Sequence, residues 1–302
     1  MKMNKLDKDY QDLLYKVMEE GSTRDDRTGT GTLSLFGTQI RHNMADGFPL
    51  LTSKKMAWKT MQAELKWFLK GETNIKPLLE DNCNIWTGDA YKKFNKYFED
   101  KGEEVDICQN GFSNHIKAND DFAKKWGELG PIYGKQWRKW RNYDSDYYDH
   151  DQIKELVSNL TKDPYSRRHL VSAWNVGDLE RMTLPPCHYA FQCYVNEGKL
   201  SLMWQQRSAD LFLGVPFNIA SYGLLLKLLA YETGLQEGEL IGNFGDTHLY
   251  SNHLLATREQ LKRTAPELPT VSISKCNILE GEFEVELNDY NPLPAIKAPL
   301  SN

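Results

Sequence analysis

The chain lacks the features that would point to a membrane, a secretion route or a polyanionic partner. No uninterrupted apolar run among its 302 residues is long enough to span a bilayer, and the first residues lack the apolar core of a signal peptide. The net charge is only -5, so no nucleic acid is expected as an obligatory partner. We therefore expect no membrane association and a small-molecule ligand.

Cysteine is scarce and has no regular spacing. The five cysteines, an odd number, lie at positions 83, 108, 187, 193 and 276 without a C-x-x-C pair. This pattern disfavours a disulfide framework and a structural zinc site. We expect a reducing, cytoplasmic setting and no metal.

The chain also lacks repeats, low-complexity tracts, a G-x-G-x-x-G fingerprint and a βαβ rhythm. Its 40% hydrophobic and 26% charged residues are ordinary for a folded chain that buries its own core. We predict one domain over residues 1–302, of the α+β class, with a mixed or mainly antiparallel twisted sheet packed with helices. Two polar stretches, 91–121 and 141–151, indicate surface insertions, because strongly patterned segments resume after each.

One predicted helix carries an acidic residue on its apolar face. In residues 59–70, Met61, Leu65 and Phe68 recur at helical spacing, and Gly71 ends the pattern. Glu64 lies on the same stripe. A carboxylate in that position must be paired, protonated or functional.

A predicted hairpin brings a cysteine toward an arginine. The apolar and aromatic runs 188–195 and 199–206 are joined by Asn196-Glu197-Gly198, so antiparallel register puts Cys187 opposite Arg207, within about one residue. A neighbouring guanidinium favours the thiolate. Taken alone, Cys187 is either a nucleophile or a small buried hydrophobe. His188 could be its base, but adjacent residues on a strand point to opposite faces.

Other polar residues stand where a ligand could be bound. Residues 217–233 are nearly all apolar and predict a buried helix, with Asn218 in its first turn. His248 and Tyr250 could bond a sugar, although a structural histidine explains that segment equally well. Several arginines lie in polar, turn-like settings that suit phosphate, although an ordinary salt bridge is the better reading of any one alone; they are Arg24, Arg27, Arg167, Arg168 and Arg207.

Seven segments together resemble the signature of the thymidylate synthase family. They are DDRTGTGT (25–32), GPIYGKQW (130–137), SRR (166–168), PPCH (185–188), QRSADLFLG (206–214), VPFNIASY (215–222) and GDTHLY (245–250). Their order and spacing match the family over essentially the whole chain. The resemblance implies reductive methylation of dUMP to dTMP, with 5,10-methylenetetrahydrofolate as co-substrate and dihydrofolate as second product.

The resemblance also implies a role for particular residues. Cys187 matches the cysteine that adds to C6 of the uracil, Asn218 the asparagine that reads the uracil edge, Glu64 the glutamate that organises proton transfer, and Tyr133 a tyrosine that assists proton removal from C5. The implied dUMP-binding residues are Arg27, Arg167, Arg168, Arg207, Ser208, Asp210, Asn218, His248 and Tyr250. The implied folate-binding residues are Ile85, Trp86, Leu184, Asp210, Leu213, Gly214, Phe217 and Ser301.

The resemblance further implies a homodimer formed through a face of the sheet, in which Arg167 and Arg168 serve the neighbouring subunit. Three features depart from the family pattern: Thr87-Gly88-Asp89, Met203-Trp204-Gln205 and the terminal Asn302. The resemblance implies that the carboxyl-terminal segment closes over the folate as a lid. A lid left looser by Asn302 would let water intercept the exocyclic methylene on C5 before hydride transfer. The alternatives are therefore a dUMP hydroxymethylase, which makes 5-hydroxymethyl-dUMP, and a non-catalytic nucleotide-binding or RNA-binding homologue.

Overall fold

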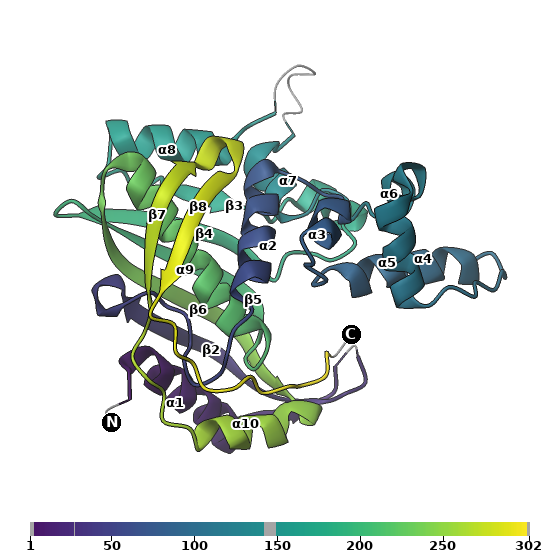
Figure 1. Cartoon of the computed structure of the whole chain (residues 1–302), viewed down its shortest axis with the longest axis horizontal. Coiled ribbons are helices and arrows are strands. Elements are labelled where there is room, and N and C mark those ends of the chain that lie inside the picture. The colour runs from purple at the N-terminus through teal and green to yellow at the C-terminus, as the bar shows by residue number, and fades with distance from the viewer. Residues whose placement is uncertain (1–2, 27, 142–148, 301–302) are drawn as a thin grey trace.

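A six-stranded mixed sheet forms the centre of the molecule (Figure 1). The computed structural model describes residues 3–26, 28–141 and 149–300. The strand order is β1-β2-β6-β5-β4-β3, and each neighbouring pair is antiparallel except β5 and β6, which are parallel. The strands are β1 Ser22–Arg24, β2 Thr32–Asn43, β3 Leu170–Ser172, β4 His188–Asn196, β5 Lys199–Asp210 and β6 Gln236–Tyr250, and β7 Thr270–Asn277 pairs with β8 Glu282–Asn288 in a separate antiparallel ribbon.

Helices pack around this sheet, which confirms the predicted α+β class. They are α1 Lys5–Glu20, α2 Trp58–Lys70, α3 Lys76–Glu80, α4 Thr87–Glu99, α5 Gln109–Ala118, α6 Asp120–Trp126, α7 Tyr133–Arg138, α8 Gln152–Lys162, α9 Gly214–Thr233 and α10 Leu254–Leu261. Short 3-10 turns lie at η1 Met44–Asp46, η2 Val176–Arg181, η3 Ser251–His253 and η4 Ile278–Glu280. No helix in the described part of the chain is both long enough and apolar enough to cross a bilayer.

The central helix α9 is buried because it is apolar on nearly every side. Its leucines 224–226, 228 and 229 are all 0% exposed, and it packs against β5, β6 and α2. The helix was predicted over 217–233 and begins three residues earlier, so Asn218 lies just past its first turn. The α9 crossover joins β5 to the parallel strand β6, a single βαβ unit that the sequence pattern did not predict.

The predicted hairpin is present, and it contains a bulge that the local sequence did not predict. Glu197 and Gly198 form a two-residue turn with positive φ at both positions, the geometry that closes a tight hairpin. That turn alone would place His188 opposite Arg207. A bulge between His188 and Ala190 shifts the register by one residue, so the Arg207 N–H donates to the Cys187 carbonyl at 2.8 Å.

The predicted helix over residues 59–70 is confirmed as α2, beginning one residue earlier. Its carboxyl end closes at Gly71, which is left-handed at φ 67. A Cβ atom at Gly71 would lie 2.9 Å from the Arg138 Cβ, so only glycine fits. Glu64 is 6% exposed on the buried face of this helix.

The polar stretch 91–121, predicted to be a surface insertion, is mostly helical. Helices α4, α5 and α6 form a lobe to one side of the sheet (Figure 1). Aromatic residues interleaved with its charges build a small core, with the Phe94 ring centroid 5.1 Å from that of Phe112 and 5.0 Å from that of Trp126. In the stretch 141–151, residues 142–148 lie outside the described part, and a backbone bridge between Trp140 and His150 closes the segment.

After β8, residues 289–300 form no further helix or strand and are anchored to the loop between β2 and α2. The Tyr290 hydroxyl donates to the Leu51 carbonyl at 3.0 Å, and the Leu293 N–H donates to the Thr52 carbonyl at 2.8 Å. Figure 1 shows this yellow segment passing close to α10 on its way to the carboxyl end. It brings Leu300 to the cavity described next.

Candidate active site

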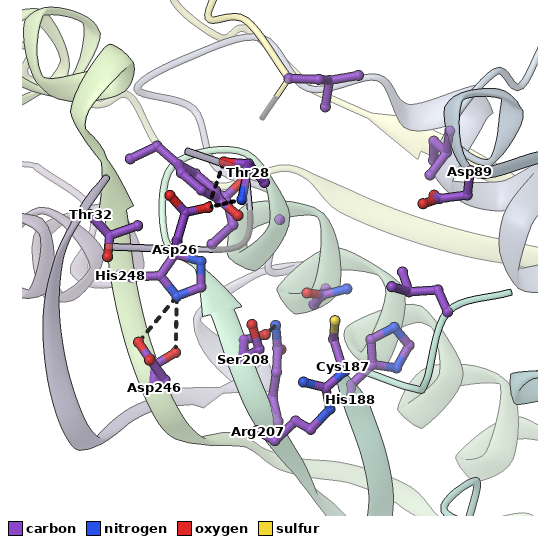
Figure 2. A pocket seen from close by; sticks show the side chains of 18 of the residues that line it. Asp26, Thr28, Thr32, Asp89, Cys187, His188, Arg207, Ser208, Asp246 and His248 are labelled. Carbon is purple, nitrogen blue, oxygen red and sulfur yellow. Dashed lines mark hydrogen bonds and ion pairs between the residues drawn. The ribbon is translucent and has the colours of Figure 1, made fainter. Parts of the chain in front are cut away.

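A cavity of about 500 Å³ opens where β5 and β6 end and where α4 and α9 begin. Its size suits a small-molecule ligand. The residues that line it are Arg24, Asp25, Asp26, Thr28, Thr32, Ile85, Trp86, Asp89, Tyr133, Leu184, Cys187, His188, Gln206, Arg207, Ser208, Asp210, Gly214, Asn218, Asp246, His248, Tyr250 and Leu300. Figure 2 shows many of these side chains converging from strands, helix ends and loops.

Cys187 lies in the wall of this cavity and is held through its backbone. Pro185 and Pro186 precede it, which prevents helix formation at this point. Its N–H donates to the Tyr133 hydroxyl at 2.7 Å, and its carbonyl accepts the Arg207 N–H at 2.8 Å. The side chain is half-buried, so its sulfur can be reached from the cavity.

Arg207 lies beside Cys187 on the neighbouring strand (Figure 2). Its Nε donates to the Pro186 carbonyl at 3.0 Å and its Nη2 to the Pro185 carbonyl at 2.8 Å. The guanidinium therefore braces the two prolines that lead to the cysteine. It also lies over the Trp174 ring, 5.5 Å from the centroid.

Tyr133 occupies an unusual backbone position at the start of α7. Its φ of 26 is positive, which is rare for a bulky residue and marks local strain. The ring stacks on Phe68 at a centroid distance of 5.0 Å, and the residue is 2% exposed. Burial raises the pKa of the hydroxyl well above its ordinary value, with the nearby Cys187 adding to the effect. Tyr133 is therefore protonated at neutral pH.

Glu64 lies directly behind the cavity wall, bonded to a tryptophan that lines it. The Trp86 Nε1–H donates to Glu64 Oε1 at 2.9 Å, and both residues are 6% exposed. Burial raises the pKa of Glu64 to about 7, although the bond from Trp86 opposes the shift. A carboxyl poised near neutral pH can both donate and accept a proton.

His188 is neutral and is bonded away from the thiol. Burial lowers its pKa to about 3, and its Nδ1 lies 2.8 Å from the Tyr222 hydroxyl. The ring packs against Tyr133 at a centroid distance of 4.4 Å. His188 is therefore part of the cavity wall, and these contacts do not place it as a base for Cys187.

Polar residues at the junction of β5 and α9 face the same cavity. Asp210 Oδ1 accepts the Phe212 N–H at 3.0 Å and the Leu213 N–H at 3.2 Å, which fixes the turn into the helix. Ser208, Gly214 and Asn218 line the cavity beside it.

On the β6 side, Asp246 organises a polar cluster. Its carboxylate accepts from Ser34 Oγ at 2.6 Å and from Arg24 Nη1 at 3.1 Å. His248 Nδ1 lies 3.3 Å from the same carboxylate (Figure 2), and its ring packs edge-on to Tyr250.

The structure brings most of the predicted site residues to the cavity and leaves some elsewhere. Leu213 and Phe217 pack against the core without lining the cavity, and Arg167 and Arg168 are exposed and lie outside it. Arg27 and Ser301 lie outside the described residues, as does the terminal Asn302.

Sequence reasoning missed other lining residues, notably Asp26, Asp89, Gln206, Asp246 and Leu300. For Asp26 a local signal existed, because an aspartate before Thr and Gly favours a turn closed by its own side chain. In the structure its carboxylate accepts the Thr28 N–H at 2.8 Å and the Gly31 N–H at 2.7 Å. The Thr28 hydroxyl, which also donates to this carboxylate, lowers the pKa of Asp26, and the two N–H groups add to the effect. Gln206 and Asp246 stand inside two of the segments that carry the family resemblance, and Asp89 lies in a departure from it, whereas Leu300 gave no local signal.

No group of three or more His, Cys, Asp or Glu side chains suited to a metal occurs among the residues that the structure describes.

The charge of the cavity is informative about the ligand that it can hold. Its described lining holds two cations, Arg24 and Arg207, against five carboxylates, those of residues 25, 26, 89, 210 and 246. This lining alone is poorly matched to a doubly charged phosphate ester.

Comparison with known proteins gives one consistent result. A sequence model of the thymidylate synthase family matches residues 8–302. A thymidylate synthase of Listeria innocua serovar 6a is 46% identical over 314 aligned positions, which cover 97% of this chain and 99% of the relative. A thymidylate synthase of Listeria monocytogenes serotype 4a has the same identity and coverage. One of Staphylococcus haemolyticus is 45% identical over 322 positions, with 99% of each chain covered.

Proposed function

Because the chain belongs to the thymidylate synthase family, the methyltransferases that convert dUMP to dTMP, we propose that it performs this reaction through the thiol of Cys187. The observation that carries the assignment of roles is the convergence on one cavity. Cys187 and Asn218 line it, and Glu64, with its pKa raised to about 7, lies one hydrogen bond behind it.

Cys187 adds to C6 of the uracil, so that C5 becomes a carbon nucleophile and charge develops on the O4 oxygen. The side-chain amide of Asn218 donates to that oxygen and reads the pattern of uracil. Arg207 contacts the phosphate while its remaining N–H groups keep the Pro185 and Pro186 carbonyls in place. Ser208 joins it on the phosphate, and His248 and Tyr250 bond the deoxyribose hydroxyl.

Two buried groups manage protons. Glu64 exchanges a proton with the pyrimidine through water, because a carboxyl with a pKa of about 7 is populated in both forms at neutral pH. Tyr133 holds the Cys187 N–H with its oxygen and keeps its own proton, so the hydroxyl can bond a base or water during proton removal from C5.

The remaining cavity surface fits a reduced folate. When bound, 5,10-methylenetetrahydrofolate supplies the one-carbon unit and a hydride. Ile85, Trp86 and Leu184 offer an apolar wall to its rings, and Asp210 offers a carboxylate to the N–H groups of the pterin. Gly214 gives backbone access at the start of α9. Asp89 stands where the family commonly has a second tryptophan, so one side of the folate would meet a carboxylate.

We also propose a homodimer whose subunits complete each other's phosphate sites. The described cavity holds more carboxylates than cations, whereas Arg167 and Arg168 are exposed outside it. The face of the sheet opposite α9 carries half-buried Met203 and Gln205 and the 9% exposed Ile241, a surface suited to a second copy.

We place the protein in the cytoplasm, because none of its five cysteines forms a disulfide.

The dimer can be tested by subunit complementation. Homodimers of Cys187→Ser and of Arg168→Ala should each be nearly inactive. After mixing and subunit exchange, one site of each heterodimer regains both an intact thiol and an intact neighbouring arginine, so activity should return to about one quarter of the wild-type value for random pairing. Failure to regain activity, with heterodimers present by mass, would refute donation across the interface.

The reaction is tested by incubating the protein with dUMP and 5,10-methylenetetrahydrofolate while product mass and dihydrofolate absorbance are followed. We expect dTMP and dihydrofolate in equal amounts. Formation of 5-hydroxymethyl-dUMP without dihydrofolate would support the hydroxymethylase instead. No turnover with retained dUMP binding would support a non-catalytic binding protein.

A further inference from the structure

A fully buried histidine, His253, lies behind the cavity wall and has no part in the reaction proposed above. It ends η3, directly after β6, and is 0% exposed. Its ring centroid lies 5.5 Å from that of Phe212 and 5.5 Å from that of Tyr250, which lines the cavity. An apolar side chain would suit these aromatic neighbours, so the polar atoms of the ring need an explanation.

One ring nitrogen is bonded to the carboxyl-terminal segment. His253 Nε2 lies 2.7 Å from the Pro299 carbonyl oxygen. Since a carbonyl only accepts, Nε2 must carry the hydrogen, which fixes the tautomer of a neutral ring. Pro299 directly precedes Leu300, which lines the cavity.

The other ring nitrogen makes no hydrogen bond within the described residues. His253 Nδ1 is buried, and the nearest charged group is the Asp210 carboxylate at 3.8 Å. That oxygen already accepts the Phe212 and Leu213 N–H groups. The hydrogen bonding of this side chain is therefore directed to Pro299.

The bond to Pro299 lies at the end of a sparsely anchored segment. Earlier anchors fix Tyr290, Leu293 and Pro294, the last through Arg263 Nη1 at 2.5 Å. Beyond Pro294, Ile296 and Ala298 make apolar contacts with the core, and among the described residues the bond to His253 is the polar anchor nearest to Leu300. Leu300 itself is 69% exposed at the cavity mouth, so little packing of its own side chain holds it there.

We propose that His253 is a positioning residue that holds the carboxyl-terminal segment over the folate side of the cavity through its bond to Pro299. This inference rests on the proposed function, because it assumes that reduced folate binds between Trp86 and Leu300. Held in that place, Leu300 covers the reacting carbon and restricts the access of water. The deoxyribose side of the cavity, at His248 and Tyr250, does not depend on this bond.

The test uses His253→Phe, which keeps a ring between Phe212 and Tyr250 and removes the donor. Loss of one buried hydrogen bond at a closing segment should raise the KM for methylenetetrahydrofolate by about 5-fold to 10-fold. The KM for dUMP should stay within about 2-fold of the wild-type value. The product ratio should also change. Where water instead of hydride adds to the methylene carbon on C5, the Cys187 bond to C6 then breaks, and the products are 5-hydroxymethyl-dUMP and tetrahydrofolate.

Two further variants separate positioning from simple loss of stability. His253→Gln places an amide donor near the site of Nε2 and should restore most of the folate KM and the product ratio. His42→Phe is the matched control, because His42 is 4% exposed and its Nε2 lies 2.8 Å from the Gly47 carbonyl, outside the cavity. It should lower the melting temperature without changing either KM.

The outcomes distinguish the inference from the function on which it rests. If the wild-type protein makes no dTMP, the proposed function is wrong. If it makes dTMP while His253→Phe keeps the wild-type folate KM and product ratio, His253 has only a structural role and the inference is overturned. An equal rise of the folate and dUMP KM values would overturn it as well.

Discussion

The buried carboxyl of Glu64 should make the folded protein less stable as the pH rises, and Glu64→Gln should remove this penalty. Burial raises the pKa of Glu64 from 4.5 to about 7, which corresponds to about 3 kcal/mol at roughly 1.4 kcal/mol per unit. The folded chain holds this proton more tightly than the unfolded chain. The stability that comes from this tighter proton binding is therefore fully present below the pKa of Glu64 in the unfolded chain. It declines between about pH 4.5 and pH 7 and is lost above that range.

Glutamine has nearly the same shape and no proton to lose, so the two proteins should have similar stability at low pH and diverge with increasing pH. For a chain of 302 residues, about 3 kcal/mol corresponds to about 5 °C in melting temperature. Calorimetry at one protein concentration, from about pH 5 to about pH 8, should show Glu64→Gln becoming progressively more stable than the wild type. Its kcat should nevertheless fall by about 10²-fold or more, because the proton exchanger is gone.

The matched control is Glu99→Gln, since Glu99 is an exposed carboxyl at the end of α4. Its difference in melting temperature from the wild type should not change across the same range. A constant difference for Glu64→Gln as well would refute the reasoning, because it would mean that burial does not keep the proton on Glu64.

Three further predictions concern the groups around the thiol. Cys187→Ser should abolish turnover and retain dUMP binding by calorimetric titration, whereas Cys108→Ser, at an exposed cysteine, should leave kcat unchanged; near-normal turnover in the first variant would overturn the mechanism. Asn218→Asp should shift preference from dUMP toward dCMP in competition assays, because a protonated carboxyl can present the complementary pattern of donor and acceptor; unchanged selectivity would contradict that role. Tyr133→Phe removes the acceptor of the Cys187 N–H, so kcat should fall by at least about 10-fold, with about 1–3 kcal/mol lost from the free energy of unfolding; an unchanged kcat would leave the hydroxyl without a catalytic role.

Elements defined by local pattern were predictable from the sequence. The period of the apolar residues and the glycine that follows located α2, and the short turn located the hairpin of β4 and β5. The place of Cys187 opposite Arg207 followed within one residue. Its final register depends on a bulge between His188 and Ala190, which the turn residues do not encode.

Features that depend on distant contacts were not predictable in this way. The polar composition of residues 91–121 concealed Phe94 and Phe112, which pack against each other, while Phe94 also packs against Trp126 just beyond the stretch, so the helices share a core of their own. Asp246 meets Arg24 across 222 positions, and Leu300 reaches the cavity from the far end of the chain. Individual residue patterns do not specify such pairings, and only the resemblance pointed to most of this site.

The titratable groups around Cys187 share one physical property, which explains the acidic residue on an apolar helix face. Burial lowers the pKa of His188 to about 3 and raises that of Tyr133 well above its ordinary value, so both are neutral at pH 7. Of these three groups, only Glu64 changes its protonation near that pH. Negative charge on the pyrimidine would thus meet neutral donors, at Tyr133 and Asn218, and a single carboxyl able to exchange a proton. The same burial that destabilises the ionised carboxyl makes it useful, so any substitution that relieves the penalty should also remove the proton transfer.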